Sequence, residues 1–217
     1  MTVRPVRRNN PRMRYWPLFD LRLHTPRLEL RVPGLADLAA EGVHDPSEMP
    51  FATPWTDAPP EERARGTIQH HWRTWAEWTP AAWHCNFVAV LNDEVVATQG
   101  LIARDFPILR EVSTGSWVGL RHHGKGIGTE MRAAVLHLAF DGLGATHATT
   151  SAYADNPASL AVSRKLGYQP DGISHRIRRG APVEEIRLRL TRDHWQETPH
   201  PEVTTTDLAP CLPLFGL

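Results

Sequence analysis

The sequence is short of several features that would each mark a class of protein. It has only two cysteines, Cys85 and Cys211, without CxxC spacing, which argues against a disulfide framework and structural zinc and suits a reducing cytoplasm. Its twelve histidines lack HExxH or similar ligand spacing. Lys plus Arg and Asp plus Glu balance at 24 each, so no overall field recruits nucleic acid or an anionic membrane. We therefore expect no metal, no membrane and no nucleic-acid partner.

Long hydrophobic runs are also absent. No segment approaches the roughly 18 continuous apolar residues of a membrane span, and no signal-peptide core follows the arginine-rich residues 1–14. We interpret residues 1–24 as an N-terminal arm whose basic start is a disordered tail or, alternatively, a nucleic-acid arm. We assign one domain to residues 25–195 and a tail to residues 196–217. We expect a soluble, cytoplasmic protein that forms a homo-oligomer.

Residue periodicity predicts an α/β (α+β) chain. Alternating or β-branched runs predict strands at residues 28–32, 87–91, 95–102, 112–120, 145–153, 173–178 and 185–190. Helical spacing predicts helices near residues 35–43, 61–78, 130–140 and 156–166. This order favours a mixed sheet with helical layers. The apolar end of the tail, residues 212–215, is expected to pack on the domain or on a partner subunit.

Two aromatic stretches allow two interpretations each. Trp72, Trp75 and Trp78 form a helical stripe with Trp83 nearby, which is typical of a core, although part of that surface could line an acceptor pocket. Residues 45–60 are rich in proline and aromatics, which favours a loop pinned by buried side chains over a binding wall.

The most informative stretch is residues 120–129, where Gly124, Gly126 and Gly128 stand between an apolar strand and a helix. Glycines can adopt φ > 0 and let successive N–H groups point at one spot. The helix that follows adds unpaired first-turn amides and its positive dipole end. The pattern predicts a phosphate site.

Two common phosphate-binding motifs are nevertheless excluded. The run from Gly119 to Gly126 is one residue short of a P-loop, because Gly126 stands where a hydroxyl must hold Mg²⁺. The glycine spacing also fails the dinucleotide pattern G-x-G-x-x-G. Nucleotide hydrolysis and dinucleotide binding are therefore disfavoured.

Residues 123–128, HGKGIG, resemble the Q/R-x-x-G-x-G/A loop of the GCN5-related N-acyltransferases (GNAT), which grips the pyrophosphate of acetyl-CoA. Residues 155–168, DNPASLAVSRKLGY, resemble the N-x-x-S-x-x-V-x-x-K/R-x-G-F/Y signature of the ribosomal-protein N-terminal acetyltransferase branch, and residues 25–31 resemble its T-x-R-L-x-L-R start. Residues 16–22, 41–46 and 128–136 are similar to an actinobacterial subgroup with a succinyl-CoA-using member. The resemblance implies a GNAT fold, in which a mixed, mostly antiparallel sheet is splayed between its fourth and fifth strands.

The resemblance also implies an activity. A primary amine, on a protein or a small molecule, would directly attack an acyl-CoA thioester in a ternary complex, with acetyl-CoA the default donor and succinyl-CoA the alternative. The resemblance implies that backbone groups orient the pantetheine and the acyl group, that the loop binds the pyrophosphate and that Asn156 contacts the pantetheine. It also implies that Ser159 protonates the leaving CoA thiolate, although Ser159 could instead be a helix-start serine that binds backbone amides. The implied backbone and loop residues are Trp117, Val118 and Gly119, then His123, Gly124, Lys125, Gly126, Ile127, Gly128 and Thr129.

Several positions depart from the family pattern. His123 replaces the loop's Gln or Arg, so that Arg121 or Lys125 would have to supply charge. Ser113 and Arg178 stand where the branch often has carboxylates, and Arg178 could instead bind a succinyl carboxylate or be a solvated strand end. No general base is evident, since Glu111, His84 and His175 are only candidates. A CoA-binding module without catalysis is therefore the alternative.

Overall fold

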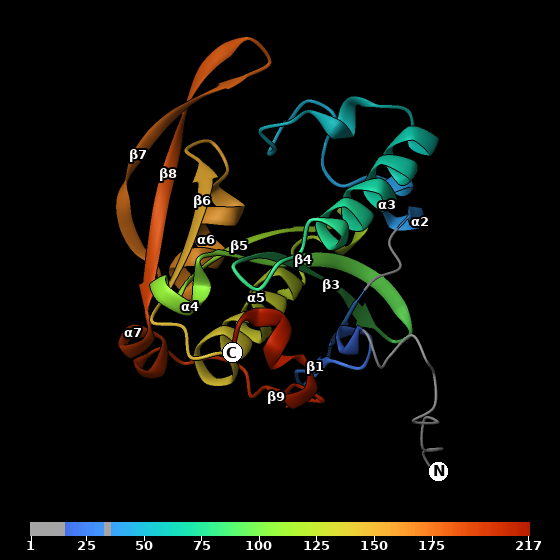
Figure 1. Cartoon of the computed structure of the whole chain (residues 1–217). Coiled ribbons are helices and arrows are strands. Elements are labelled where there is room, and N and C mark those ends of the chain that lie inside the picture. Colours follow the sequence, from blue (N-terminus) through green and yellow to red (C-terminus); the bar gives the residue numbers. More distant parts are fainter. Residues whose placement is uncertain (1–15, 33–35) are drawn as a thin grey trace.

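The computed structural model describes residues 16–32 and 36–217, and the basic start of the expected N-terminal arm lies outside them. Nine strands form one sheet in the order β7-β8-β6-β5-β4-β3-β2-β1-β9 (Figure 1). The strands are β1 (Arg22–His24), β2 (Glu29–Arg31), β3 (Ala82–Leu91), β4 (Glu94–Arg104), β5 (Glu111–Val118), β6 (His147–Tyr153), β7 (Gln169–Arg178), β8 (Ala181–Thr191) and β9 (Thr204–Thr206). Every neighbouring pair is antiparallel except β5 and β6. The predicted mixed, mostly antiparallel sheet is confirmed.

The helices cover both faces of this sheet. They are α2 (Ala36–Glu41), α3 (Pro60–Ala76), α4 (Phe106–Leu109), α5 (Ile127–His137), α6 (Pro157–Lys165) and α7 (Arg192–Glu197), joined by short 3₁₀ or π segments η1 (Pro17–Phe19), η2 (Trp55–Asp57), η3 (Leu120–His122), η4 (Leu138–Gly142) and η5 (Ala209–Phe215). The α5 helix packs on β4 and β5, and α6 packs on β6 and α5, whereas α3 packs on β3. None of the described helices combines the length and apolar character that a bilayer crossing needs.

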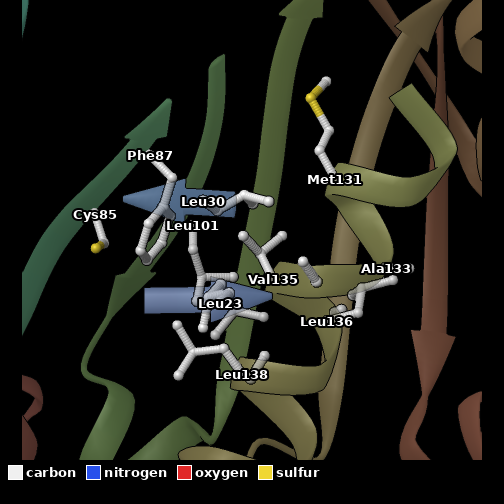
Figure 2. Close-up of a cluster of buried hydrophobic side chains, with 14 of the residues drawn as sticks. Leu23, Leu30, Cys85, Phe87, Leu101, Met131, Ala133, Val135, Leu136 and Leu138 are labelled. Atoms are coloured by element: carbon white, nitrogen blue, oxygen red, sulfur yellow. The ribbon is translucent and has the colours of Figure 1, made fainter. Parts of the chain in front are cut away.

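The main core lies between the sheet and α5. Figure 2 shows Leu23, Leu30 and Leu101 from the strands facing Val135 and Leu136 of α5, and all of them are fully buried. The period of two along the strands and the 3.6-residue period of the helix bring these apolar faces together. This layer fixes α5, and therefore the glycine loop at its start, against β5.

The sheet opens between β5 and β6. These strands pair from Glu111↔His147 to Ser113↔Thr149 and then separate, so residues 115–118 of β5 have β4 on one side and no described strand on the other. The β3–β4 hairpin closes tightly because Asn92 and Asp93 both take φ > 0, as a two-residue turn of this kind requires. The splay predicted from the resemblance is present as the gap between β5 and β6.

Both ends of the described chain belong to the same core. Leu18, Leu21 and Leu23 are fully buried, so the packed region begins before Thr25. At the other end β9 pairs with β1, and Phe215 of η5 is fully buried with its ring centroid 4.9 Å from that of Trp83. The apolar tail therefore packs on its own domain.

The tryptophan stripe divides along α3. Trp75 lies edge-on to Phe19 with ring centroids 5.6 Å apart, and Trp78 donates its indole N–H to Leu214 O at 2.8 Å, so both serve packing. Trp72 is 63% exposed. The core interpretation therefore holds for the C-terminal part of the stripe.

Candidate active site

The glycine loop leads directly from β5 into α5. Gly124 has φ +72° and Gly126 has φ +78°, and Gly126 is the N-cap of α5. These left-handed values favour glycine because a Cβ would be strained there. Gly128 differs, since it is an ordinary helical residue whose added Cβ would meet Val162 and Val118 only at van der Waals distance. The cradle is thus formed by two left-handed glycines and the unpaired amides of the first turn of α5.

A buried carboxylate ties this loop to the N-terminal strands. Glu130, in the first turn of α5, accepts hydrogen bonds from Thr25 Oγ1 at 2.6 Å, Arg27 N at 3.0 Å and Arg27 Nε at 2.7 Å. The Arg27 guanidinium also donates to Lys125 O at 3.2 Å, in the middle of the loop. The TxR start of the motif therefore fixes the loop's shape and places a cation beside it. Sequence analysis quoted this motif without finding that role, because its partner lies 103 residues away.

We predict that replacing Arg27 with glutamine weakens CoA binding. The change removes the ion pair with Glu130 and the support of Lys125 O, and it leaves a buried carboxylate short of donors. We expect about a tenfold rise in the Kd for CoA by calorimetry. Arg31→Gln is the matched control, because Arg31 is an exposed residue of β2, the strand that follows Arg27, and its ion pair is with Glu29. Equal affinities for the wild type and Arg27→Gln would contradict this role.

The cations that the sequence suggested for the loop are placed differently. Arg121 forms ion pairs with Glu41, at 2.7 Å, and with Glu94, so its charge is directed away from a ligand. The His123 ring lies 2.9 Å from Val118 O through Nε2, and only a ring N–H can donate to a carbonyl. A neutral His123 in this tautomer has no second N–H for a phosphate. Lys125 forms no ion pair with any described residue.

The free edge of β5 offers backbone groups to the splay. Gly119 N donates to Val96 O on β4, whereas Thr114 O and Val118 O accept bonds from the other side, from Thr150 Oγ1 and His123. Because ladder bonds alternate along a strand, the backbone groups of Ser116 and Val118 face the splay. Of the predicted residues 117–119, Val118 is thus placed for backbone contact with a donor. The backbone groups of Trp117 and Gly119 face β4. Ser116 was not among the residues that the sequence predicted.

The floor of the splay carries a buried cation. Arg132 of α5 donates to Ser163 Oγ at 2.8 Å and to Ser116 Oγ at 3.1 Å, and burial lowers its pKa from the usual arginine value. Arg132 Nε and the nearby Gln99 Oε1 are both buried without a hydrogen-bond partner among the described residues. A charge buried without a carboxylate is costly. Arg132 escaped sequence analysis because it sits within the apolar run of α5.

The start of α6 lies at the same end of the sheet. Since β5 and β6 are parallel, their carboxyl ends meet at one edge, with the glycine loop after β5 and Asn156 directly after β6. Asn156 Oδ1 caps α6 by accepting from Ser159 N at 3.1 Å. The half-buried Ser159 hydroxyl makes no hydrogen bond with a described residue, so it is not consumed by helix capping.

An aromatic wall stands on the α3 side of β5. Trp117 lies beside Trp55 with ring centroids 5.8 Å apart, Trp55 lies 5.2 Å from Phe51, and Phe51 lies 5.7 Å from His44. Phe51 and Trp55 are only half-buried. The loop of residues 45–60 therefore both packs on β5 and presents ring surface beside the splay, which combines the two interpretations of its sequence.

Arg178 is already occupied. Its two terminal nitrogens bind the Asp155 carboxylate at 2.9 and 2.5 Å, its guanidinium lies 4.7 Å from the Tyr153 ring centroid, and Nη1 also donates to Met49 O at 3.2 Å. The bonds to Asp155 raise the pKa of Arg178 and lower that of Asp155. The Arg178 guanidinium is therefore not free to bind the carboxylate of a donor.

The three base candidates lie in different settings. Glu111 pairs with Arg189 at 2.7 Å, and His175 is exposed on the edge strand β7. His84 of β3 is half-buried, and burial, followed by the neighbouring His70 and His71, lowers its pKa to about 4. Glu111 lies on β5, at the paired base of the splay, whereas His84 lies on β3, two strands away from β5. No group of three or more His, Cys, Asp or Glu in the part of the chain that the structure describes is placed to hold a metal ion.

These features match a known family along most of the chain. The model of the acetyltransferase (GNAT) domain matches residues 27–169. The chain belongs to the GNAT acetyltransferase family. This match spans strands β2 to β6 with the β5–β6 splay, the glycine loop and α6.

Solved GNAT structures share the fold. RimJ of Mycobacterium smegmatis, in complex with CoA-disulfide, is 20% identical with a TM-score of 0.63, covering 91% of this chain and 95% of that one. A GCN5-related N-acetyltransferase from Brucella melitensis is 16% identical with a TM-score of 0.63, covering 81% and 80%. A chimera of the Vibrio cholerae spermidine N-acetyltransferase SpeG is 16% identical with a TM-score of 0.58, covering 78% and 98%.

The histidine cluster between α3 and β3 predicts a pH-dependent stability. Burial is the main reason that the pKa values of His71 and His84 are lowered to about 4, from the ordinary histidine value of 6.5. The unfolded chain therefore binds protons below pH 6.5 that the folded protein does not, so stability falls as pH drops from 6.5 toward 4. The slope is about 1.4 kcal/mol per pH unit for each histidine.

Urea denaturation between pH 7 and 5 measures this slope. The charged and polar groups near the His84 ring are His70 and His71 on α3 and Asn86 on β3, and His70 also lies next to His71. Arg73, on α3, and Glu77, which caps it, act on His70. Asp155, whose pKa is lowered from 3.8, titrates below this window. His84→Gln should give a shallower pH dependence than the wild type, and an unchanged slope would show that His84 is not buried in its neutral form.

Proposed function

We propose that this protein transfers an acyl group from acyl-CoA to a primary amine by direct attack within a ternary complex. One observation carries the proposal: the glycine cradle, the free edge of β5 and the start of α6 all meet at the carboxyl end of the β5–β6 splay. The cradle suits a pyrophosphate and the splay suits an extended chain that pairs with a strand edge. Positioning of the thioester then supplies most of the rate.

Different residues of the chain would bind the two ends of the donor. Amides of residues 124–129 would bind the pyrophosphate, with charge from Arg27 and Lys125. The backbone of Ser116 and Val118 would pair with the pantetheine, and Asn156 Nδ2 is left to contact it while Oδ1 caps α6. The Ser159 hydroxyl, which has no hydrogen-bond partner among the described residues, would protonate the leaving CoA thiolate.

Acetyl-CoA is the donor that this geometry favours. A succinyl donor would need a free cation for the carboxylate at the end of its acyl group, and the Arg178 guanidinium already binds Asp155. Succinyl-CoA therefore remains a second donor to be compared directly. The acceptor is a primary amine of a protein or small molecule.

A CoA-binding module without catalysis is the competing function. It is motivated by Ser113, which stands where the branch often has a carboxylate. The nearby carboxylate of Glu111 is held by Arg189. The two functions are separated by incubating the protein with acetyl-CoA or succinyl-CoA and an amine panel, with free thiol as the readout. We expect amine-dependent thiol release that is faster with acetyl-CoA. Tight CoA binding without release on any amine would support the module.

A further inference from the structure

An unfilled space lies over β5 beside the splay. Gly115 is exposed in the middle of this strand, and a Cβ built on it meets no atom within 4 Å. Its partner on β4 is a second glycine, Gly100. Glycine weakens a strand interior and often marks a place where a ligand approaches the backbone closely. The paired glycines therefore lower the surface of the sheet beside the splay.

Only this face of the splay is open to a second substrate. On the opposite face α5 and α6 close the floor, where Arg132, Ser163 and Thr114 are each more than nine-tenths buried. On the open face α3 packs on β3 and leaves β5 uncovered at Gly115. An amine that attacks a thioester held between β5 and β6 must therefore arrive over Gly115.

The His84 imidazole forms one wall of this space. Its Nε2 lies 2.8 Å from the point that a Gly100 Cβ would occupy, and Gly115 O lies 3.4 Å from the same point, so the ring leans from β3 over β4 toward β5. On its other side it contacts the His70 ring, with centroids 5.5 Å apart. Because burial lowers its pKa to about 4, the ring is neutral at physiological pH and carries one N–H. In the tautomer with this proton on Nδ1, Nε2 is a hydrogen-bond acceptor.

The other walls indicate which amines fit. Trp117 lies two residues after Gly115 and therefore on the same face of β5, and its ring centroid is 5.8 Å from that of Trp55, so aromatic surface borders the space. Three carboxylates on or directly after β5, β6 and β8 are each held by an arginine: Glu111 by Arg189, Asp155 by Arg178 and Glu185 by Arg176. A polyamine would find no free carboxylate among them, whereas a flat apolar group would find the tryptophan faces.

We propose that the acceptor amine binds over Gly115 with one N–H donated to His84 Nε2, and that it is a monoamine joined to a flat apolar group. This inference rests on the proposed N-acyltransferase activity. The amine binds in its neutral form, its lone pair forms the C–N bond, and the C–S bond breaks. One amine proton ends on the CoA sulfur, so the products are an amide and CoA thiol. No covalent enzyme intermediate or other co-reactant is required.

Gly115→Ala tests the site with the smallest possible change. The residue has ordinary strand φ and open space around the added Cβ, so we expect an unchanged unfolding midpoint and unchanged CoA affinity. We expect kcat/KM for the amine to fall at least about tenfold, because the methyl group occupies the approach path. Gly66→Ala on α3, where an added Cβ also meets nothing, is the matched control and should keep wild-type kinetics.

The outcomes separate this inference from the proposed function. No thiol release by the wild type with any amine would refute the activity itself. An active wild type with an equally active Gly115→Ala would overturn the acceptor site alone, as would a loss confined to acetyl-CoA binding. The panel compares phenethylamine with spermidine, and faster acylation of spermidine would overturn the proposed amine class.

Variants of His84 test its hydrogen bond. His84→Phe keeps a ring but loses the acceptor atom, so we expect about a tenfold rise in the amine KM with the KM for acetyl-CoA unchanged. His84→Gln keeps an acceptor and should recover part of this loss, whereas His175→Gln on β7 should change nothing. A purely structural histidine would predict equal losses in Phe and Gln variants and a change in both KM values, and that result would overturn the assignment.

Discussion

Replacing Gly126 with valine is expected to raise the Kd for CoA about a hundredfold. Gly126 has φ +78°, which a β-branched residue adopts only with strain, and its Cβ would lie 3.5 Å from Arg27 Nη2. The loop must then change shape and lose about two hydrogen bonds to the pyrophosphate, each worth roughly 1.5 kcal/mol. Calorimetry with CoA measures this loss.

The control for Gly126→Val is Gly144→Val. Gly144 has a similar φ of +73°, but it lies between η4 and β6, away from the loop. It should destabilise the fold by a similar amount and leave CoA affinity within about twofold of the wild type, as expected for strain without loss of ligand contacts. If both variants lost affinity equally, the effect would be one of stability and the loop would not be the phosphate site.

The largest effect on stability is expected from Phe215→Ala, at about 3–5 kcal/mol. Phe215 is fully buried, and its ring lies edge-on to Trp83 and to Trp78, with centroids 4.9 and 5.5 Å away. Removing the ring leaves a cavity under α3 and η5. Urea denaturation measures the free energy of unfolding. Leu217→Ala, at a residue that is 38% exposed, should change it by less than about 0.5 kcal/mol.

This comparison also tests how the C-terminal segment is organised. A small effect of Phe215→Ala, no greater than that of Leu217→Ala, would mean that η5 does not dock on the domain in solution. The sequence left docking on the domain or on a partner subunit open, because an apolar segment is compatible with both. The structure places it against Trp78 and Trp83 of the same chain.

The elements that could be predicted are those with a local signal. The β3–β4 hairpin follows from two β-branched runs around a polar turn, and α6 follows from its Asn-Pro start and Gly167 after its end. The glycine loop was found because glycine at φ > 0 has no common substitute. The start of α5 was placed three residues late, because Ile127, Gly128 and Thr129 were assigned to the loop alone.

The features that could not be predicted from the sequence depend on contacts between residues that are distant in the chain. The Arg27–Glu130 ion pair joins the segment before β2 to α5. The strands β1 and β9 have only three residues each, too few to show a periodic pattern. His84 was recognised only as one base candidate among three. Its placement over Gly100, beside Gly115, requires the register of three strands, which no local pattern encodes.

A single-turnover experiment with acetyl-CoA carrying an isotopic label in the acetyl group tests the central claim most directly. The protein is mixed with labelled acetyl-CoA and the preferred amine, and mass spectrometry follows the label. Direct transfer in a ternary complex predicts that the label passes from CoA to the amine nitrogen in step with thiol release, and that no labelled protein is seen with or without amine. Label bound covalently to the protein before the amine is added, or label that stays on CoA with every amine, would contradict the account.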